Sequence, residues 1–323
     1  MNEYVPLPED PSQSALASTP NNGPGAPAYV PAYAKGLVSL TGAELLMRPF
    51  PPRENILAPW LPTQGLAMVY AERGIGKTWV GLNVAYAIAS GGSYLEWTAP
   101  KPRKVVYIDG EMPGSLLQER FRIVAASSDH DAPEDGFRLV AADLQADGLP
   151  DLSDVNAQRF YDAEIRDADL IIVDNLSTIA RGSRENEADG WTPVQAWMLA
   201  QRAAGRSVLL IHHAGKGGGQ RGTSKREDVL DTVINLRRPV DYEPAHGARF
   251  EVHYEKARGI YGDAVTPFEA HLIEGKWRTA PIVVVADDET LRKLQGQGLS
   301  IRDIEKRTGL SKSKVQRRLK GGE

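Results

Sequence analysis

The chain has 323 residues, of which 41% are hydrophobic and 25% charged, and its net charge is −4. This length and composition suit one large or two smaller globular domains with a buried core. The absence of cysteine excludes disulfides, thiol catalysis and cysteine-ligated zinc. Because we find neither a signal-peptide pattern nor an apolar run of roughly 18 residues, we expect a cytoplasmic protein without a membrane partner.

Residues 1–36 are rich in Pro, Gly, Ser, Asn and Ala and hold few large apolar side chains. So little apolar surface does not offset the entropy lost on ordering, and we expect a disordered tail. Globular patterning runs over 37–280, and a basic segment occupies 285–323. We take these three ranges as the domains.

The stretch 66–80 predicts a phosphate-binding loop. An apolar run ends at Ala71, a Gly-containing turn follows, and Lys77 and Thr78 open a segment with helical spacing. In a P-loop, backbone N–H groups cradle the phosphates, the Lys reaches the β- and γ-phosphates, and the Thr hydroxyl holds Mg²⁺. Ala71 stands where the pattern has its first glycine, so its backbone must adopt a conformation open to an L-residue. The expected nucleotide-binding residues are Glu72, Arg73, Gly74, Ile75, Gly76, Lys77, Thr78 and Trp79.

Two further apolar runs end in carboxylates. Residues 105–108 are followed by Asp109 and Glu111, and residues 170–173 are followed by Asp174. Such runs are typical of buried parallel strands, whose carboxyl ends are where open α/β sheets bind ligands. Four apolar residues closed by an Asp form the Walker B pattern, in which the carboxylate orients Mg²⁺.

A third apolar run, 208–211, leads into His212 and His213 and then a Gly-rich basic loop. Two histidines at a strand end beside such a loop favour a phosphate sensor or a nucleic-acid contact. Later strand patterns over 229–239, 248–262 and 267–279 indicate an antiparallel extension of the sheet. Near the end of the second, Lys256 and Arg258 are two residues apart and point to the same side. A solvated edge is the alternative explanation for this pair.

Residues 287–323 carry ten Lys or Arg against six Asp or Glu. Ile301 and Ile304 mark one helix, a turn follows over 308–310, and a second helix begins with Ser311 as its N-cap. This helix-turn-helix spacing indicates nucleic-acid contact, whereas the alternative is a basic hairpin packed on the larger domain or a neighbouring subunit. The candidate contacts are Lys312, Lys314, Arg317 and Arg318.

Four motifs in this order resemble those of a known family: AERGIGKT (71–78), VVYIDGEMP (105–113), LIIVDNL (170–176) and LLIHHAGKG (209–217). The chain resembles RecA-fold ATPases of the AAA_25 type, in particular those related to the plasmid replicative helicase RepA and the wider DnaB-type helicases, over about residues 50–275. The resemblance implies a RecA-like α/β core, with a mostly parallel twisted sheet, helices on both faces and an antiparallel extension. The small helix-turn-helix-like segment at the C-terminus is an addition to that pattern.

The resemblance also implies roles for individual residues. Glu111 would be the general base, Asp174 would organise Mg²⁺, and His213 or its neighbour His212 would sense the γ-phosphate. YEKARG (254–259) looks like the element that supplies Lys256 and Arg258 to the site of an adjacent subunit, and Arg237 or Arg238 is the competing candidate. Such a shared site requires an oligomer, which the resemblance implies is a hexameric ring.

The leading hypothesis is a ring-forming motor that hydrolyses ATP with Mg²⁺ and acts on single-stranded DNA as a replicative helicase does. Plasmid, phage or integrated-element replication is the process that the resemblance implies. The expected channel contacts to phosphates are Lys216, Arg221, Lys225 and Arg226. A second hypothesis is an ATP-switched regulator whose C-terminal helices read duplex DNA. A third is a helicase loader or accessory protein without unwinding activity.

Overall fold

The computed structural model describes residues 37–182, 188–215, 227–239, 242–282, 288–296, 298–308 and 310–320. The chain divides into two compact units, with the boundary between Phe50 and Pro51. Channel candidates Lys216, Arg221, Lys225 and Arg226 and the predicted tail 1–36 lie outside the described residues. None of the described helices is long and apolar enough to cross a membrane.

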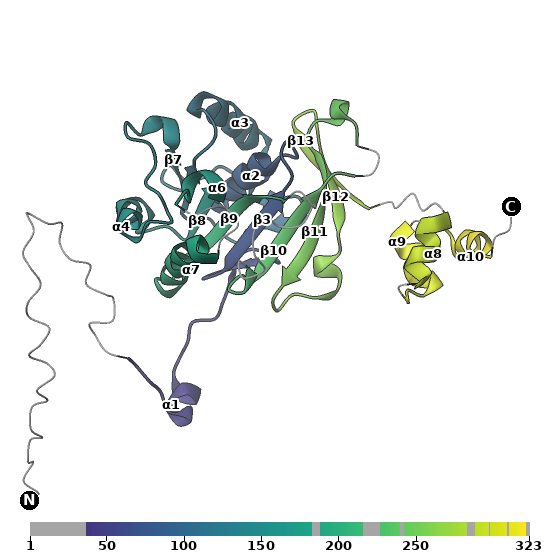
Figure 1. Cartoon of the computed structure of the whole chain (residues 1–323), viewed down its shortest axis with the longest axis horizontal. Helices are drawn as coiled ribbons and strands as arrows, with labels where there is room; N and C mark the ends of the chain where they lie inside the picture. Colours follow the sequence, from purple (N-terminus) through teal and green to yellow (C-terminus); the bar gives the residue numbers. More distant parts are fainter. Residues whose placement is uncertain are drawn as a thin grey trace, which may run out of the picture. The chain divides into compact units, whose positions relative to one another are not determined.

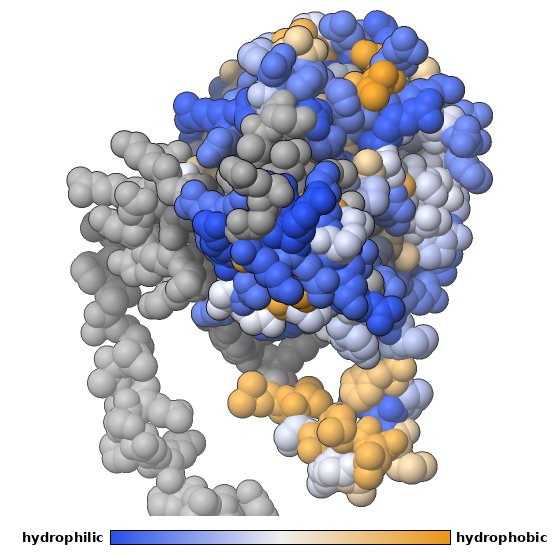
Figure 2. Space-filling model, turned by 90° about the vertical axis from the view of Figure 1, so that its right-hand side faces the viewer, coloured by the Kyte–Doolittle hydropathy of each residue, from blue (hydrophilic) through white to orange (hydrophobic). Residues whose placement is uncertain are grey.

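The first unit contains the short helix α1 (Gly42–Met47). A capping box begins it: the Thr41 hydroxyl accepts the Glu44 N–H, and the Glu44 carboxylate accepts the Thr41 N–H at 2.7 Å. All six helical residues are described and none is buried. Leu46 and Met47 are more than four-fifths exposed, and Figure 2 shows this segment as the orange group at the bottom.

A nine-stranded sheet forms the centre of the second unit (Figure 1). Its strands are β3 (Leu66–Ala71), β6 (Val105–Asp109), β7 (Phe137–Ala141), β8 (Leu170–Asp174), β9 (Ser207–His213), β10 (Thr232–Arg237), β11 (Arg249–Ala257), β12 (Phe268–Ile273) and β13 (Lys276–Pro281). Their spatial order is β13-β12-β11-β10-β3-β9-β8-β6-β7. The strands from β10 to β7 in this order are parallel, and β11, β12 and β13 are antiparallel. The RecA-like α/β fold is therefore confirmed, except that β10, the first strand of the predicted antiparallel extension, belongs to the parallel part.

Helices cover both faces of this sheet (Figure 1). The α-helices are α2 (Lys77–Ser90), α3 (Gly114–Ser127), α4 (Val155–Gln158), α5 (Asp162–Ile165), α6 (Leu176–Ile179) and α7 (Ala188–Ala203). The 3₁₀ turns are η2 (Ala142–Leu144), η3 (Arg159–Tyr161), η5 (Pro244–His246) and η6 (Gly262–Val265). The elements α4, η3 and α5 follow one another without a gap from Val155 to Ile165, so the polar stretch 153–167 contains one helical segment whose middle turn is 3₁₀. Only Tyr161 and Ile165 are buried among these three elements.

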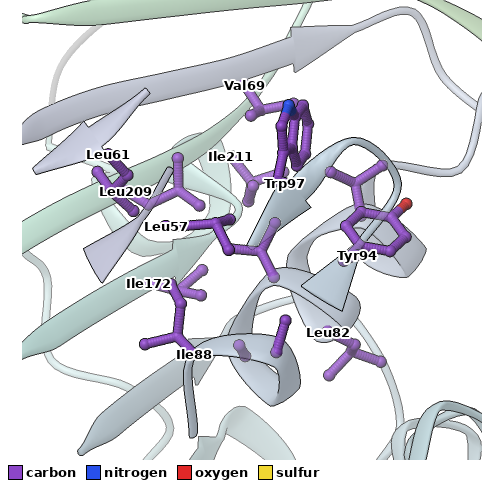
Figure 3. Packing of buried hydrophobic residues seen from close by; sticks show 14 of the residues in the cluster. Leu57, Leu61, Val69, Leu82, Ile88, Tyr94, Trp97, Ile172, Leu209 and Ile211 are labelled. Carbon is purple, nitrogen blue, oxygen red and sulfur yellow. The ribbon is translucent and has the colours of Figure 1, made fainter. Parts of the chain in front are cut away.

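Strand alternation creates two cores. Along β3, Ala67, Val69 and Ala71 face α2, whereas Leu66, Met68 and Tyr70 face the α7 side. The α2 core also contains Trp60 and Trp97, which meet edge to face at 5.2 Å between ring centroids. Figure 3 shows part of this core around Leu57, Val69 and Ile211. Two small antiparallel β-ribbons contribute residues to the α2 core: β1 (Asn55–Leu57) with β2 (Leu61–Pro62), and β4 (Ser93–Tyr94) with β5 (Trp97–Thr98).

Three helices form a separate cluster at the C-terminal end: α8 (Asp288–Gly296), α9 (Ile301–Thr308) and α10 (Lys312–Leu319). Leu291, Leu294, Ile304 and Val315 make its core, and Figure 2 shows strongly hydrophilic outer surface here. Ser311 is the N-cap residue of α10, as predicted, although its side chain makes no capping hydrogen bond. Glu305 accepts the Lys312 N–H at 3.0 Å instead, because α9 brings that carboxylate to the start of α10.

Candidate functional site

The P-loop joins β3 to α2. Ala71 is the last residue of β3 and is fully buried. Because a strand residue has an extended backbone, this position needs no glycine. Its carbonyl accepts the Ala214 N–H at 2.8 Å. Gly74 and Gly76, by contrast, have φ values of 77° and 120°, which an L side chain rarely adopts. Gly76, the one glycine of the pattern that this chain keeps, is thus a position where the loop geometry requires glycine, and Gly74 is a second such position outside the pattern.

Lys77 lies at the start of α2, with its side chain turned back over the loop. Its Nζ donates to the carbonyl oxygens of Glu72 at 2.9 Å and Ala71 at 3.2 Å. Burial lowers the pKa of Lys77, and the nearby charges of Asp174 and Glu111 oppose that shift. A cation therefore stands at the centre of the loop, where phosphate charge would be bound.

Asp174 ends β8 and is buried between two hydroxyl groups. Tyr107 Oη donates to its Oδ2 at 2.6 Å, and the Thr78 hydroxyl also hydrogen-bonds to it. Burial raises the pKa of Asp174, and both hydrogen bonds act against that rise. Tyr107 reaches this position past Gly81 of α2, where an added Cβ would lie 2.6 Å from its hydroxyl oxygen.

Asp109 ends β6 and is the register neighbour of Asp174 on β8. Its Oδ1 accepts the N–H groups of Glu111 at 2.9 Å and Met112 at 2.7 Å, which fixes the turn that carries Glu111. Its Oδ2 is buried and has no hydrogen-bond partner among the described residues. Burial, followed by the charge of Asp174, raises the pKa of Asp109 to about 7.

Glu111 projects from the turn after β6 and meets side chains from β9 and from the start of α6. Asn175 Nδ2 donates to Glu111 Oε2, and His213 Nε2 lies 3.6 Å from the same oxygen. Burial, followed by the positive charge of Lys77, lowers the pKa of His213. Because side chains alternate along β9, His212 points to the other face of the sheet, so His213 is the histidine that faces Glu111.

These groups fit a nucleoside triphosphate with Mg²⁺. Gly74 and Gly76 open the loop for backbone approach, and Thr78 and Asp174 offer adjacent hydroxyl and carboxylate oxygens. Among the described residues, no cluster of three or more His, Asp or Glu could hold a metal. Mg²⁺ needs none, because it is commonly held by one or two carboxylates together with substrate phosphates and water.

Trp79 lies on α2, one residue past Thr78. Arg120 of α3 stands over its ring, with the guanidinium carbon 5.3 Å from the ring centroid. Trp79 therefore contacts the α2–α3 interface as well as adjoining the P-loop. The contact of Trp79 with nucleotide stays a prediction.

Lys256 and Arg258, here called the trans pair, lie away from the P-loop of their own chain. Ala257 pairs with Thr232 at the start of β10, and Thr232 pairs with Ala67 near the start of β3. The pair therefore lies beside the amino-terminal ends of the parallel strands, opposite the carboxyl ends that carry the nucleotide site. Lys256 Nζ donates to the Glu227 carbonyl, and Arg258 Nη2 donates to the Asp228 carbonyl at 2.7 Å.

Arg237 and Arg238, the competing candidates, lie at the P-loop edge. An added Cβ on Gly74 would lie 3.5 Å from Arg238 Nη2. Arg238 also stands over the Tyr242 ring at 4.0 Å, and Arg237 pairs with Glu255 at 3.0 Å. Arg238 thus lies beside the P-loop of its own chain.

The predicted C-terminal contacts all lie on α10. Lys312, Lys314 and Arg317 are exposed, whereas Arg318 donates to Asp288 Oδ1 at 2.6 Å. Three of the four predicted contact residues are therefore open to solvent.

Sequence reasoning missed Tyr107 and Asn175 and assigned no task to Asp109. Tyr107 has a sequence signal, because its hydroxyl is a polar group inside the otherwise apolar run 105–108 and it shares a strand face with Asp109. Asn175 adjoins Asp174, but its contact with Glu111 depends on the loop after β6 folding toward β8. That contact has no sequence signature.

One family model and two solved structures are similar to this chain. The model of the AAA_25 family, an AAA domain, matches residues 36–219. The flagellar accessory protein FlaH from Methanocaldococcus jannaschii aligns with 68% of this chain and 90% of its own, at 11% identity and a TM-score of 0.48. A KaiC-like protein from the hyperthermophilic archaeon Pyrococcus horikoshii aligns with 71% and 99%, at 14% identity and a TM-score of 0.49. With its P-loop, its Walker B carboxylate and a family match over more than half its length, the chain belongs to the AAA_25 family of RecA-like P-loop ATPase domains.

Proposed function

We propose that the protein hydrolyses ATP, with Glu111 as the general base that polarises the attacking water. One observation carries the proposal: Lys77, Thr78, Glu111, Asp174 and His213 come from four separate segments and meet at the carboxyl ends of β3, β6, β8 and β9. Bound Mg²⁺ would neutralise phosphate charge, and Thr78 and Asp174 would hold it.

The chain's own residues divide the work. Lys77 binds the phosphates, and Asn175 and His213 orient the Glu111 carboxylate toward the loop. His213 is uncharged at neutral pH because burial and Lys77 lower its pKa, so it would act on Glu111 as a hydrogen-bonding group. Such a contact changes when phosphate is present or absent, which suits the sensor role that the resemblance implies.

Glu111→Gln tests the base. We expect ATP affinity to stay within about threefold and turnover to fall by about a hundredfold or more, because Gln keeps the shape but accepts no proton. The measurements are equilibrium nucleotide binding and phosphate release. Glu119→Gln, which changes an exposed Glu on α3, is the matched control and should behave as wild type. Unchanged turnover in Glu111→Gln would remove this residue from the mechanism.

We propose further that the trans pair completes the site of an adjacent subunit in a ring, expected to be a hexamer, that acts on single-stranded DNA. Its place opposite its own nucleotide site supports this, because the pair cannot reach the P-loop of its own chain. Arg238 serves its own subunit in this arrangement. The order of motifs resembling RepA and DnaB-type proteins supports the helicase role, and unwinding of a forked duplex is the assay that decides it.

Subunit mixing tests the trans pair. Lys77→Ala and Arg258→Ala are each expected to be inactive alone, but a mixture places intact P-loops beside intact trans pairs. With random assembly at equal amounts, about a quarter of the interfaces become complete, so roughly a quarter of wild-type ATPase activity should return. Activity equal to the sum of the separate variants would refute a shared site.

The second candidate function is an ATP-switched regulator that binds duplex DNA, or a loader without unwinding activity. It is favoured by the α8–α10 cluster, which has its own core and exposes Lys312, Lys314 and Arg317. Salt-dependent duplex binding that is lost in a Lys312→Ala/Lys314→Ala/Arg317→Ala variant, with no strand separation by wild type, would support this candidate over the helicase.

A further inference from the structure

Glu255 lies at an irregularity in the pairing of β10 with β11. Consecutive residues Val233 and Ile234 pair with Lys256 and Tyr254, so Glu255 is the extra residue of a β-bulge. A bulge bends and twists its strand and redirects side chains. Lys256 follows immediately, so the direction of the trans pair depends on how this bulge is held.

Three side chains from two other strands hold the Glu255 carboxylate. Its Oε2 accepts from Tyr70 of β3 at 2.5 Å. Its Oε1 accepts from Asn235 at 2.8 Å and Arg237 at 3.0 Å, both at β10. Burial by itself raises the pKa of Glu255, but these hydrogen bonds outweigh it and keep the pKa below its ordinary value. The carboxylate is therefore ionised at neutral pH, and charge-assisted bonds fix the bulge.

The same bonds connect the P-loop strand to the trans pair. Tyr70 and Asn235 are buried register neighbours, and Tyr70 directly precedes Ala71, whose carbonyl accepts from Lys77. Glu255, at the other end, directly precedes Lys256. A shift of β3 relative to β11 must therefore either break these bonds or move the bulge with it.

We propose that Glu255 is a positioning residue that sets the direction in which Lys256 and Arg258 project toward a neighbouring subunit. Its hydrogen bond from Tyr70 links this direction to the P-loop strand of the same subunit. The inference rests on the proposed function, in which the pair acts in trans. A purely structural role for Glu255 would instead damage every task of the subunit that carries the change.

The direction of this effect is testable by placing Glu255→Ala on one side of a mixed interface. The reference mixture combines Lys77→Ala subunits, which supply the trans pair, with Arg258→Ala subunits, which supply the P-loop. In one test mixture Glu255→Ala is added to the Lys77→Ala subunit, and in the other to the Arg258→Ala subunit. Glu251→Ala in the Lys77→Ala subunit is the matched control, because Glu251 is on the same strand and bonds to His253 at 2.8 Å.

We expect restored ATPase activity to fall about tenfold or more when Glu255→Ala is on the subunit that supplies the trans pair, as misplacement of a catalytic group does. On the P-loop side it should keep at least about half of the reference activity, because the pair there is already disabled. Equal losses on both sides, or no loss on the trans-pair side, would overturn the inference.

Two outcomes separate this inference from the proposed function. A reference mixture that restores no activity refutes the trans pair, and the role of Glu255 falls with it. A reference mixture that restores activity, together with an unaffected trans-pair side, refutes Glu255 alone. If Glu255→Ala does not fold, Glu255→Gln keeps the side-chain length without the charge and should show the same asymmetry, with a smaller loss.

Discussion

The stability of Asp109→Asn relative to wild type should increase as the pH rises from acid to alkaline. The carboxyl has a pKa of about 7 in the fold against 3.8 in an unfolded chain, because burial and Asp174 disfavour its charge. Between these values the folded state holds a proton that the unfolded state has released. The free energy of unfolding of wild type therefore falls as pH rises through this window.

The magnitude follows from the same pair of values. At about 1.36 kcal/mol per pKa unit, the full penalty is about 4 kcal/mol at pH 8, of which about 3 kcal/mol accrues between pH 5 and pH 8. Asn has no charge to bury, and its Oδ1 can still accept the N–H groups of Glu111 and Met112. The stability of Asp109→Asn relative to wild type should thus rise by about 2–3 kcal/mol from pH 5 to pH 8.

Urea denaturation at pH 5 and pH 8, without nucleotide, measures this difference. Asp151→Asn is the control of opposite sign. Burial by itself raises the pKa of Asp151, but hydrogen bonds from Ser153 and Arg181 outweigh it and lower that pKa overall, so Asp151 contributes stability that is lost only as pH falls toward the acid range. The loss in the free energy of unfolding caused by Asp151→Asn should therefore be equal at pH 5 and pH 8. A pH-independent effect of Asp109→Asn, or a loss at pH 8, would refute the reasoning.

Three further substitutions follow from the site. Ala71→Gly restores the usual glycine, yet should leave ATP affinity within about twofold and lower the free energy of unfolding by about 1 kcal/mol, because Ala71 is a buried strand residue; a clear gain in affinity in nucleotide titration would contradict this. Tyr107→Phe removes a donor to Asp174, so ATP binding should weaken by about tenfold in Mg²⁺ and much less in its absence; equal weakening in both titrations would place the role of Tyr107 elsewhere. Gly81→Ala should lower the free energy of unfolding by about 1–3 kcal/mol in thermal or urea denaturation, because its Cβ would meet the Tyr107 hydroxyl at 2.6 Å; adding Tyr107→Phe should recover part of that loss.

Local patterns were enough to predict the elements that carry the nucleotide site. Apolar runs closed by Asp174 and by His212–His213 are local signals, since a buried parallel strand needs apolar side chains on both faces and its polar residues gather at its carboxyl end. The 3₁₀ turn in the middle of the helical segment over 153–167 was not predicted, because the few buried side chains of this stretch give only a weak periodic pattern.

The sequence by itself determined the P-loop, the apolar runs that end in Asp174 and in His212–His213, and the basic character of the last 37 residues, because each depends on neighbours within a few positions. Only the tertiary structure decided that Ala71 is harmless at the end of a strand, that His213 and not His212 faces Glu111, and that Tyr107 holds Asp174 through a space left by Gly81. It also placed Arg238 beside its own P-loop and the trans pair at the opposite edge. These outcomes depend on strand order and register, which bring together residues that lie far apart in the chain and which no local pattern encodes.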